Sequence, residues 1–597
     1  MAAVDRIVAL RAEMQKRGID IYIVPTSDFH ESEYVGDYFK AREYLTGFTG
    51  SAGTAVITMS EAGLWTDGRY FIQAERQLEQ SLVKLYRVGE EGVPTVKEYV
   101  EQMLPIGGCL GFDGRIVNAN AGEEYSKIVE KKQGELAALE DLTGIIWQNR
   151  PQLPRNPAFI LEEKYAGEST GSKVKRVREN MQKNQAEVHI LTSLCDIAWL
   201  FNIRGSDIAH VPVTLSYAVI TMDESIWFVQ KEALNQEVQD YCRKNYISVT
   251  DYQAIYDYAE RIEPGKAVLM DKHIVNYRIF CCLNDQVSVI QEKNPTEQMK
   301  AVKNPTELSN IRKAHVKDGI AFTNFMYWLK TTVGQQELTE ISASDCLEQC
   351  RRQQDLFVDL SFDTISAYGA NGAMMHYSAT EQTNAALKPK GFLLVDSGGH
   401  YFQGSTDITR TISLGDLTRE EKLHFTTVCR SNLNLAAAKF LYGCRGSNLD
   451  ILARGPLWNL GLDYKCGTGH GIGYLLNVHE SPNGFRWRIV PERSDSCVLE
   501  EGMVTTDEPG IYLEGKYGIR IENELVCKKA EKNEYGQFME FEIITYAPID
   551  LDAILPEEMT QTERRLLNDY HKMVYDKISP YLDTKVKDWL KEYTREI

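Results

Sequence analysis

The stretch DSGGHYFQGSTDITRT, residues 396–411, carries two aspartates within a segment rich in glycine, serine and threonine. The apolar run GFLLV before Asp396 predicts a buried strand. The alternating pattern TDITRTI predicts a second strand, with Asp407 and Thr409 on one face and Ile408 on the other. Glycines between the strands favour a sharp return of the chain, so pairing would bring the two carboxylates together. Close carboxylates in a half-buried site repel each other, and a proton or an intervening cation must relieve the repulsion.

Three more Gly-rich segments in the last third of the chain carry polar side chains on expected strands or turns. His470 lies in GTGHGIG, Glu508 lies before a Pro-Gly turn in TTDEPGIY, and Glu522 lies in YGIRIENEL. Singly, each is typical of a loop or a solvated turn. Together with the two aspartates they form an ordered set of four acids and one histidine, which suits Mn²⁺, Co²⁺ or Zn²⁺. Such a set can hold two ions about 3.5–4 Å apart and activate a water for hydrolysis.

Length and composition set the frame. A chain of 597 residues is too long for one hydrophobic core and predicts three or four domains. The net charge of -19 argues against nucleic acid as a partner. Asp5, Arg6 and Arg11 interrupt the apolar pattern of the first helix, so an amphipathic helix is expected there and not a secretory signal. No apolar run reaches about eighteen residues, so we expect no membrane span.

The 12 cysteines are scattered, and no two of them have the CxxC spacing. Cys346 and Cys350, four residues apart in a helical stretch, are expected to pack rather than to bind metal. We therefore expect free thiols and a reducing compartment, the cytoplasm.

Proline-rich and capping patterns divide the chain. NRPQLPRNP, residues 149–157, has the composition of a linker, and Asn304-Pro305-Thr306-Glu307 is typical of a helix start. Between these marks, residues 197–221 echo residues 42–58, since both end in a strand of the type AVIT. The interpretation is an α/β (α+β) chain with domains at 1–157, 158–303 and 304–597.

The four Gly-rich segments resemble those of the pita-bread metallopeptidases, a family that includes methionine aminopeptidase, prolidase and Xaa-Pro aminopeptidase. Two smaller domains before the catalytic one resemble the long, three-domain form of Xaa-Pro aminopeptidase (aminopeptidase P). The resemblance implies two related creatinase-N-like α/β domains, then a pita-bread catalytic domain with a C-terminal helical tail. It also implies a metal-ligand set, matched by order: Asp396, Asp407, His470, Glu508 and Glu522.

The resemblance implies further roles residue by residue. His376, in ANGAMMHY, matches a histidine that lines the site and contacts the intermediate. His479, in NVHE, matches a histidine that hydrogen-bonds the substrate near the scissile carbonyl. Glu508 matches the metal ligand that acts as general base, and Arg520 matches an arginine that orients the site through a carboxylate. Tyr512 matches a tyrosine on the substrate side.

One position departs from the family pattern. Many members have HGTGH where this chain has CGTGH, so that Cys466 stands in place of a histidine four residues before His470. The replaced histidine lies on the substrate side, so the metal set is unaffected. A nucleophilic thiol is one interpretation of Cys466. A small residue tolerated beside the site is the interpretation we favour, because a metal-activated water already supplies a nucleophile.

The expected activity is release of the first residue from peptides with proline second, by attack of a metal-bridging hydroxide on the Xaa-Pro bond. Because the proline nitrogen carries no hydrogen, the site must not rely on an N–H donor there. Two divalent ions are expected, Mn²⁺ first, with Zn²⁺ or Co²⁺ as alternatives, in a cytoplasmic homodimer that uses no nucleic acid or membrane.

Three alternatives are kept. One is an Xaa-Pro dipeptidase of the prolidase type, and another is a non-catalytic binding protein of the same fold. A metal-free hydrolase of the creatinase type is the third, and the complete acidic ligand set argues against it.

Overall fold

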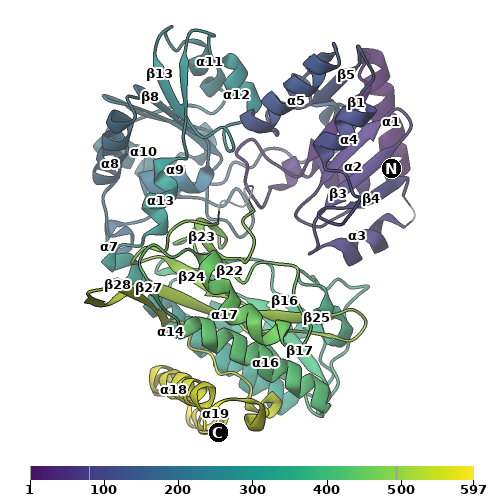
Figure 1. Cartoon of the computed structure of the whole chain (residues 1–597). Helices are drawn as coiled ribbons and strands as arrows, with labels where there is room; N and C mark the ends of the chain where they lie inside the picture. The colour runs from purple at the N-terminus through teal and green to yellow at the C-terminus, as the bar shows by residue number, and fades with distance from the viewer. Residues whose placement is uncertain (1, 80, 491–494) are drawn as a thin grey trace. The chain divides into compact units, whose positions relative to one another are not determined.

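The computed structural model describes residues 2–79, 81–490 and 495–597. It contains two compact units, one made of residues up to 162 with 168–296 and the other of 163–167 with 297–597 (Figure 1). Within the described ranges, none of the helices has the length and apolar character that crossing a membrane requires. The boundaries predicted at 157/158 and 303/304 stay our proposal.

The first unit begins with a six-stranded sheet in the order β4-β3-β2-β1-β5-β6. The flanking strands β4, β5 and β6 run parallel to their neighbours, whereas β1, β2 and β3 pair antiparallel. Its strands are β1 (Ile21–Pro25), β2 (Thr54–Thr58), β3 (Ala62–Thr66), β4 (Val83–Arg87), β5 (Cys109–Phe112) and β6 (Glu135–Ala137). Its helices are α1 (Ala3–Arg17), α2 (Ala41–Thr46), α3 (Phe71–Leu78), α4 (Val96–Met103), α5 (Ala119–Lys131) and α6 (Leu142–Ile146).

The second sheet of this unit repeats the first, in the order β12-β11-β10-β8-β13-β14 with the same pattern of parallel and antiparallel pairs. Its strands are β8 (Val188–Leu191), β10 (Ser216–Thr221), β11 (Ser225–Val229), β12 (Ile247–Asp251), β13 (Ala267–Met270) and β14 (Ser288–Gln291). Its helices are α8 (Thr170–Lys183), α9 (Leu194–Phe201), α10 (Gln236–Lys244), α11 (Ala254–Glu260) and α12 (Tyr277–Cys282), with a small β7 (Phe159–Ile160) and β9 (Ile203–Arg204) pair. Because β2 and β10 are equivalent strands, the predicted internal repeat is confirmed.

A second repeated segment was not predicted from the sequence. DGRIVNAN (113–120) and DKHIVNYR (271–278) lie at equivalent positions, and each asparagine caps its following helix. The backbone N–H of Tyr277 donates to Val117 and that of Ala119 donates to Val275, both at 2.8 Å. The two copies thus contact each other as a pseudo-symmetric pair.

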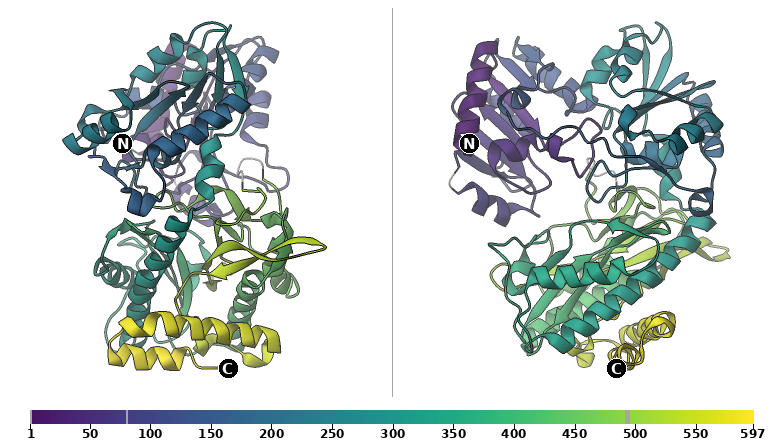
Figure 2. Two further views of the ribbon diagram at one scale, coloured as in Figure 1. Left: turned by 90° about the vertical axis from the view of Figure 1, so that its left-hand side faces the viewer. Right: turned by 180° about the vertical axis from the view of Figure 1, so that it is seen from behind.

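The second unit contains the curved sheets of the last third of the chain. Figure 2 shows the long helix α14 running beside these strands, and α18 with α19 packing together near the C-terminus. The sheets have the orders β21-β28-β27-β24-β22-β23, β16-β17-β20, β15-β18-β19 and β25-β26.

The strands of the second unit are β15 (Phe357–Leu360), β16 (Ile365–Tyr368), β17 (Phe392–Ser397), β18 (Gly399–Tyr401), β19 (Gly404–Ser405), β20 (Ile408–Ser413), β21 (Lys439–Leu441), β22 (Gly469–Gly471), β23 (Glu480–Phe485), β24 (Val504–Asp507), β25 (Gly510–Leu513), β26 (Tyr517–Arg520), β27 (Asn523–Asn533) and β28 (Gly536–Ile543). The helices from residue 163 onward are α7 (Glu163–Ala166), α14 (Pro305–Thr332), α15 (Glu340–Arg352), α16 (Arg419–Ala436), α17 (Gly446–Trp458), α18 (Gln561–Ile578) and α19 (Thr584–Tyr593), while α13 (Pro295–Ala301) spans the division between the units.

Helix starts follow the predicted caps. The side chain of Asn304 accepts from the N–H groups of Thr306 and Glu307, and the Glu307 carboxylate accepts from the Asn304 N–H. Pro305 occupies the first turn, where a missing N–H costs nothing. Thr418 forms a capping box at the start of α16 in the same way. In α18, one face packs in an apolar cluster of the second unit through Leu567, Tyr570, Val574 and Ile578.

The stretch 396–411 forms the predicted pair of strands with an addition. β17 and β20 pair antiparallel, with Asp396 opposite Thr409. Between them the chain forms a second small hairpin, β18 with β19, which the sequence analysis treated as a loop. The two faces of β20 differ as predicted, since Thr409 bonds to Glu522 while Ile408 and Ile412 pack in an apolar cluster.

Candidate metal centre

Three of the predicted ligands converge in the second unit. Asp407 precedes β20, His470 lies in β22, and Glu522 lies between β26 and β27. One ligand atom from each of these side chains lies within 4.8 Å of the others. His470 Nε2 lies 3.5 Å from Asp407 Oδ2. Strands of different sheets in the second unit therefore bring Asp407 close to Glu522, more than a hundred positions further along the chain.

The other two predicted ligands border this cluster. Glu508 follows β24, and its Oε1 lies 3.4 Å from His470 Nε2. Asp396 is the penultimate residue of β17 and is buried. Among the residues that the structure describes, its Oδ1 has no hydrogen-bond partner. A buried carboxylate oxygen without a donor is a ready metal ligand, because leaving it bare is costly.

The electrostatics of this group call for a cation. Burial raises the pKa of Asp407 well above its usual range, and the carboxylates of Glu522, Asp396 and Glu508 raise it further. Burial also raises the pKa of Glu522, again with help from Glu508 and Asp396. Without a positive charge, protons would have to neutralise the cluster. Carboxylate oxygens with one imidazole nitrogen are the donor set that divalent ions such as Mn²⁺ and Zn²⁺ accept, so the residues fit two such ions.

Arg520 ties the candidate ligands to the strands around them. It is buried, and its Nη2 donates to Asp396 Oδ2 while its Nη1 donates to the Tyr512 hydroxyl at 2.7 Å. Its Nε reaches Thr409 Oγ1 at 3.1 Å, and that hydroxyl donates to Glu522 Oε2 at 2.6 Å. The arginine therefore contacts one predicted ligand directly and a second through one hydroxyl.

The two predicted substrate histidines lie on different segments. His479 stands against the cluster, with its ring centroid 4.2 Å from that of His470 at an interplanar angle of 88°. His376 follows Met375, whose carbonyl accepts from Arg520 Nη2 at 3.5 Å. The segment that carries His376 is thus bonded to the arginine that holds Asp396.

Cys466 is a half-buried cysteine in the loop that leads to His470. Burial raises its pKa to about 11, and the charge of Glu508 adds to the effect. At neutral pH the side chain is a protonated thiol, which is a poor nucleophile. Its carbonyl accepts from Arg454 Nη2 at 3.1 Å. These facts favour the interpretation of Cys466 as a tolerated neighbour of the site.

A buried ion pair on α17 supports the loop that leads to His470. Arg454 donates to Asp450 at 2.9 Å, and both side chains are fully buried. Arg454 also donates to the Tyr464 carbonyl at 2.9 Å, and Thr468 donates to Asp450 at 2.5 Å. The Thr468 carbonyl in turn accepts from the Glu508 N–H at 2.8 Å. One helix therefore sets the path of the loop that precedes His470, and Thr468 in that loop bonds the backbone of Glu508.

Glu524, which bonds the backbone of Asp407, was not predicted from the sequence. Glu524 is fully buried, its Oε1 accepts from the Asp407 N–H at 2.8 Å, and its Oε2 lies 3.0 Å from His315 Nε2. The signal was present, because in an extended strand residues 522 and 524 point to the same face.

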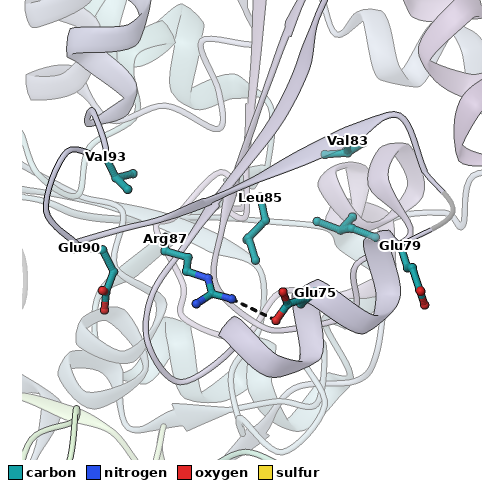
Figure 3. Close-up of a pocket in the computed structure, with 8 residues that line it drawn as sticks. Glu75, Glu79, Val83, Leu85, Arg87, Glu90 and Val93 are labelled. Atoms are coloured by element: carbon teal, nitrogen blue, oxygen red, sulfur yellow. Dashed lines mark hydrogen bonds and ion pairs between the residues drawn. The ribbon is translucent and has the colours of Figure 1, made fainter.

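A pocket elsewhere has no such chemistry. It lies between α3 and β4 in the first unit, has a volume of about 400 Å³, and is drawn in Figure 3. Arg87 and Glu75 pair across it at 3.0 Å. None of the predicted site residues is among those that line it: Glu75, Leu78, Glu79, Val83, Leu85, Arg87, Glu90 and Val93.

Comparison with known proteins places the chain in a family. The Creatinase/Prolidase N-terminal domain is matched twice, at 6–151 and 149–307. Metallopeptidase family M24 is matched at 309–529, and the C-terminal region of peptidase M24 at 537–597. A protein of Coprinopsis cinerea named probable Xaa-Pro aminopeptidase P is 37% identical over 99% of this chain and 98% of its own. The chain belongs to metallopeptidase family M24.

Two further relatives cover this M24 chain completely. A Penicillium rubens protein, also named probable Xaa-Pro aminopeptidase P, is 37% identical over 100% of both chains. The crystal structure of X-prolyl aminopeptidase from Caenorhabditis elegans, described as a cytosolic enzyme with a di-nuclear active site, superposes with a TM-score of 0.95. It is 33% identical and covers 100% of both chains. The predictions of a hydrolytic enzyme and of a pita-bread domain behind two related α/β domains are confirmed, and two divalent ions are supported.

Proposed function

We propose that this M24 chain is a dinuclear metal aminopeptidase that releases the first residue from peptides whose second residue is proline. The observation that carries the proposal is the convergence of Asp407, His470 and Glu522 in a chain that aligns end to end with Xaa-Pro aminopeptidases. The same cluster speaks against the creatinase-type and the non-catalytic alternatives, because those need no buried acidic set.

We assign the two ions to five residues: Asp396, Asp407, His470, Glu508 and Glu522. Bound there, two divalent ions lower the pKa of a water and stabilise the oxygens of a hydrolytic intermediate. Mn²⁺ is the ion that we propose, with Zn²⁺ and Co²⁺ as alternatives. Burial raises the pKa of Glu508, which favours proton uptake by its carboxylate, and we propose that it takes up a proton and returns it to the leaving nitrogen.

The remaining roles are assigned to groups that surround the cluster. Arg520 keeps Asp396 oriented and holds Tyr512 beside it, which supports a substrate-side role for the tyrosine. His479, which packs against His470, and His376 are proposed to hydrogen-bond the substrate near its scissile carbonyl. Each would stabilise charge that develops on the scissile carbonyl oxygen.

The protein is proposed to act as a cytoplasmic homodimer on peptide substrates. An apolar group on the surface of the second unit supports a subunit contact. Trp458, 39% exposed, and Trp487, 41% exposed, pack edge to face at 5.8 Å, and Ile451 and Leu460 lie beside a groove next to α17. Exposed apolar groups of this kind are typical of association surfaces. Light scattering at micromolar concentration tests the dimer.

The test of the activity is a peptide panel measured with and without a chelator. Xaa-Pro dipeptides, Xaa-Pro-Xaa tripeptides and longer peptides are each compared with a matched peptide that has alanine second. Cleavage of the first bond in tripeptides and longer peptides supports the aminopeptidase. Cleavage restricted to dipeptides would instead establish the prolidase-type alternative.

A further inference from the structure

A buried carboxylate outside the metal cluster collects donors from the segment that carries His376. Glu340, the first residue of α15, is fully buried. Its Oε1 accepts from the Tyr368 N–H at 2.7 Å and from Asn371 Nδ2 at 2.9 Å. Its Oε2 accepts from the Tyr377 hydroxyl at 2.8 Å and from the Ala385 N–H at 2.9 Å. All four donors lie between residues 368 and 385, and all four are neutral.

The buried Glu340 carboxylate holds its four neutral donors firmly. Each hydrogen bond to an ionised group is worth about twice a neutral one, and removing the acceptor would take away one bond from each of four donors, of which Tyr377 is buried and the others are half-buried. The position at the start of a 13-residue helix also favours a negative charge there. The same end of α15 adds backbone bonds, since the Glu340 N–H donates to the Ala385 carbonyl at 3.1 Å.

The segment fastened by Glu340 runs along the candidate metal centre. Tyr377, which bonds Glu340, is the neighbour of His376 in the chain. On the other side of His376, the Met375 carbonyl accepts from Arg520, which bonds Asp396. His376 therefore stands between one residue tied to Arg520 and one tied to Glu340.

We propose that Glu340 is a positioning residue for the peptidase reaction, and that its carboxylate fixes the segment 368–385 so that His376 meets the substrate at the metal centre. The inference rests on the proposed function for the role of His376. The four hydrogen bonds to Glu340 are observed in the structure and do not depend on the proposed function.

The deciding variant is Glu340→Gln, which keeps the size of the side chain but replaces one accepting oxygen with a donating amide. We expect kcat on an Xaa-Pro-Xaa tripeptide to fall by about 10- to 100-fold, because a reacting group displaced by about 1 Å can cost 100-fold. KM should change by less than about threefold, because His376 is proposed to act mainly on the charge that develops on the carbonyl oxygen in the transition state. Metal content should equal that of the wild-type chain, and calorimetric titration of Mn²⁺ into the apoprotein should give the same affinity.

Hydrogen–deuterium exchange supplies a readout that does not depend on activity. Peptides covering 368–385 should exchange faster in Glu340→Gln, while peptides covering 396–411 should exchange as in the wild type. Glu348→Gln is the matched control on the same helix, since Glu348 is partly exposed and pairs only at the surface with Arg352. It should leave kcat, metal affinity and exchange unchanged.

Tyr377→Phe keeps the test decisive if Glu340→Gln fails to fold. It removes one of the four donors and should lower kcat by a smaller factor, with faster exchange over the same segment. Wild-type kcat together with wild-type exchange in either variant would overturn the proposal, and so would loss of metal affinity. If the wild-type enzyme cleaves no Xaa-Pro peptide, the proposed function fails. Faster exchange over 368–385 in Glu340→Gln would still show that the Glu340 carboxylate fixes this segment.

Discussion

Asp407 and Glu522 are the residues on which the proposed metal centre depends most. Each lies in the cluster with His470, and burial with mutual repulsion raises the pKa of both. We expect Asp407→Ala or Glu522→Ala to abolish metal loading and turnover while the chain stays folded, because a shared ligand has no substitute. Asp416→Ala, at an exposed position, is the control. Normal metal content and activity in the first two variants would refute the ligand assignment.

His479 offers a prediction of a different kind. It packs against His470 without belonging to the close group of ligand atoms. His479→Ala should lower kcat by about 10²–10³, the usual cost of one stabilising donor, and leave metal content intact. Metal analysis and kinetics on the same preparation check it. Loss of metal would show that His479 is a ligand.

Cys466 should prove dispensable. Because burial holds its pKa at about 11, the thiol is protonated at neutral pH. We expect Cys466→Ala and Cys466→Ser to keep most of the turnover, with any change mainly in KM. Cys466→His, the common family residue, should also be tolerated. A Cys466→Ala enzyme with full metal and no activity would make the thiol the nucleophile.

Single residues also mark the limit of what the sequence could reveal. Asp396, His470 and Glu522 could be proposed as ligands because each stands in a short motif with glycines or strand alternation around it. Glu340 could not be found this way, because its donors begin 28 positions further along the chain and include two backbone groups. Nothing local distinguishes such a glutamate from one on a surface helix.

At the scale of elements, α17 supports the loop that leads to His470 through the Arg454–Asp450 pair. Arg454→Met should destabilise the protein by about 3–5 kcal/mol, because a buried aspartate would lose its partner. The control is Lys529→Met, which breaks a pair whose side chains are 57% and 50% exposed and should cost less than about 0.5 kcal/mol. Denaturant unfolding compares the two, and equal stabilities would contradict the assigned support role.

Element boundaries followed local chemistry where local chemistry was strong. The cap at Asn304 predicted the start of α14 because its bonds reach only three residues ahead. The hairpin of β18 and β19 was missed, since strands of two and three residues leave no period to detect. Pairing with β15, some forty residues earlier, is what orders it.

At the scale of the whole molecule, the repeated topology of the first unit was visible only as a weak echo. The matching strand orders establish the repeat, because two copies of one fold can diverge widely in sequence while the pattern of buried residues is kept. The assignment to family M24 likewise rests on agreement along the full chain. No single motif carries it.

The central claim is that two divalent ions held by this chain drive cleavage after the first residue of an Xaa-Pro peptide. The most direct measurement combines metal analysis with product identification on one Xaa-Pro-Xaa tripeptide, before chelation, after it, and after restoring Mn²⁺. We predict about two ions per chain, release of the free first residue, loss of that product with the metal, and its return on adding Mn²⁺. Unchanged release of the first residue from the metal-free protein would contradict the account.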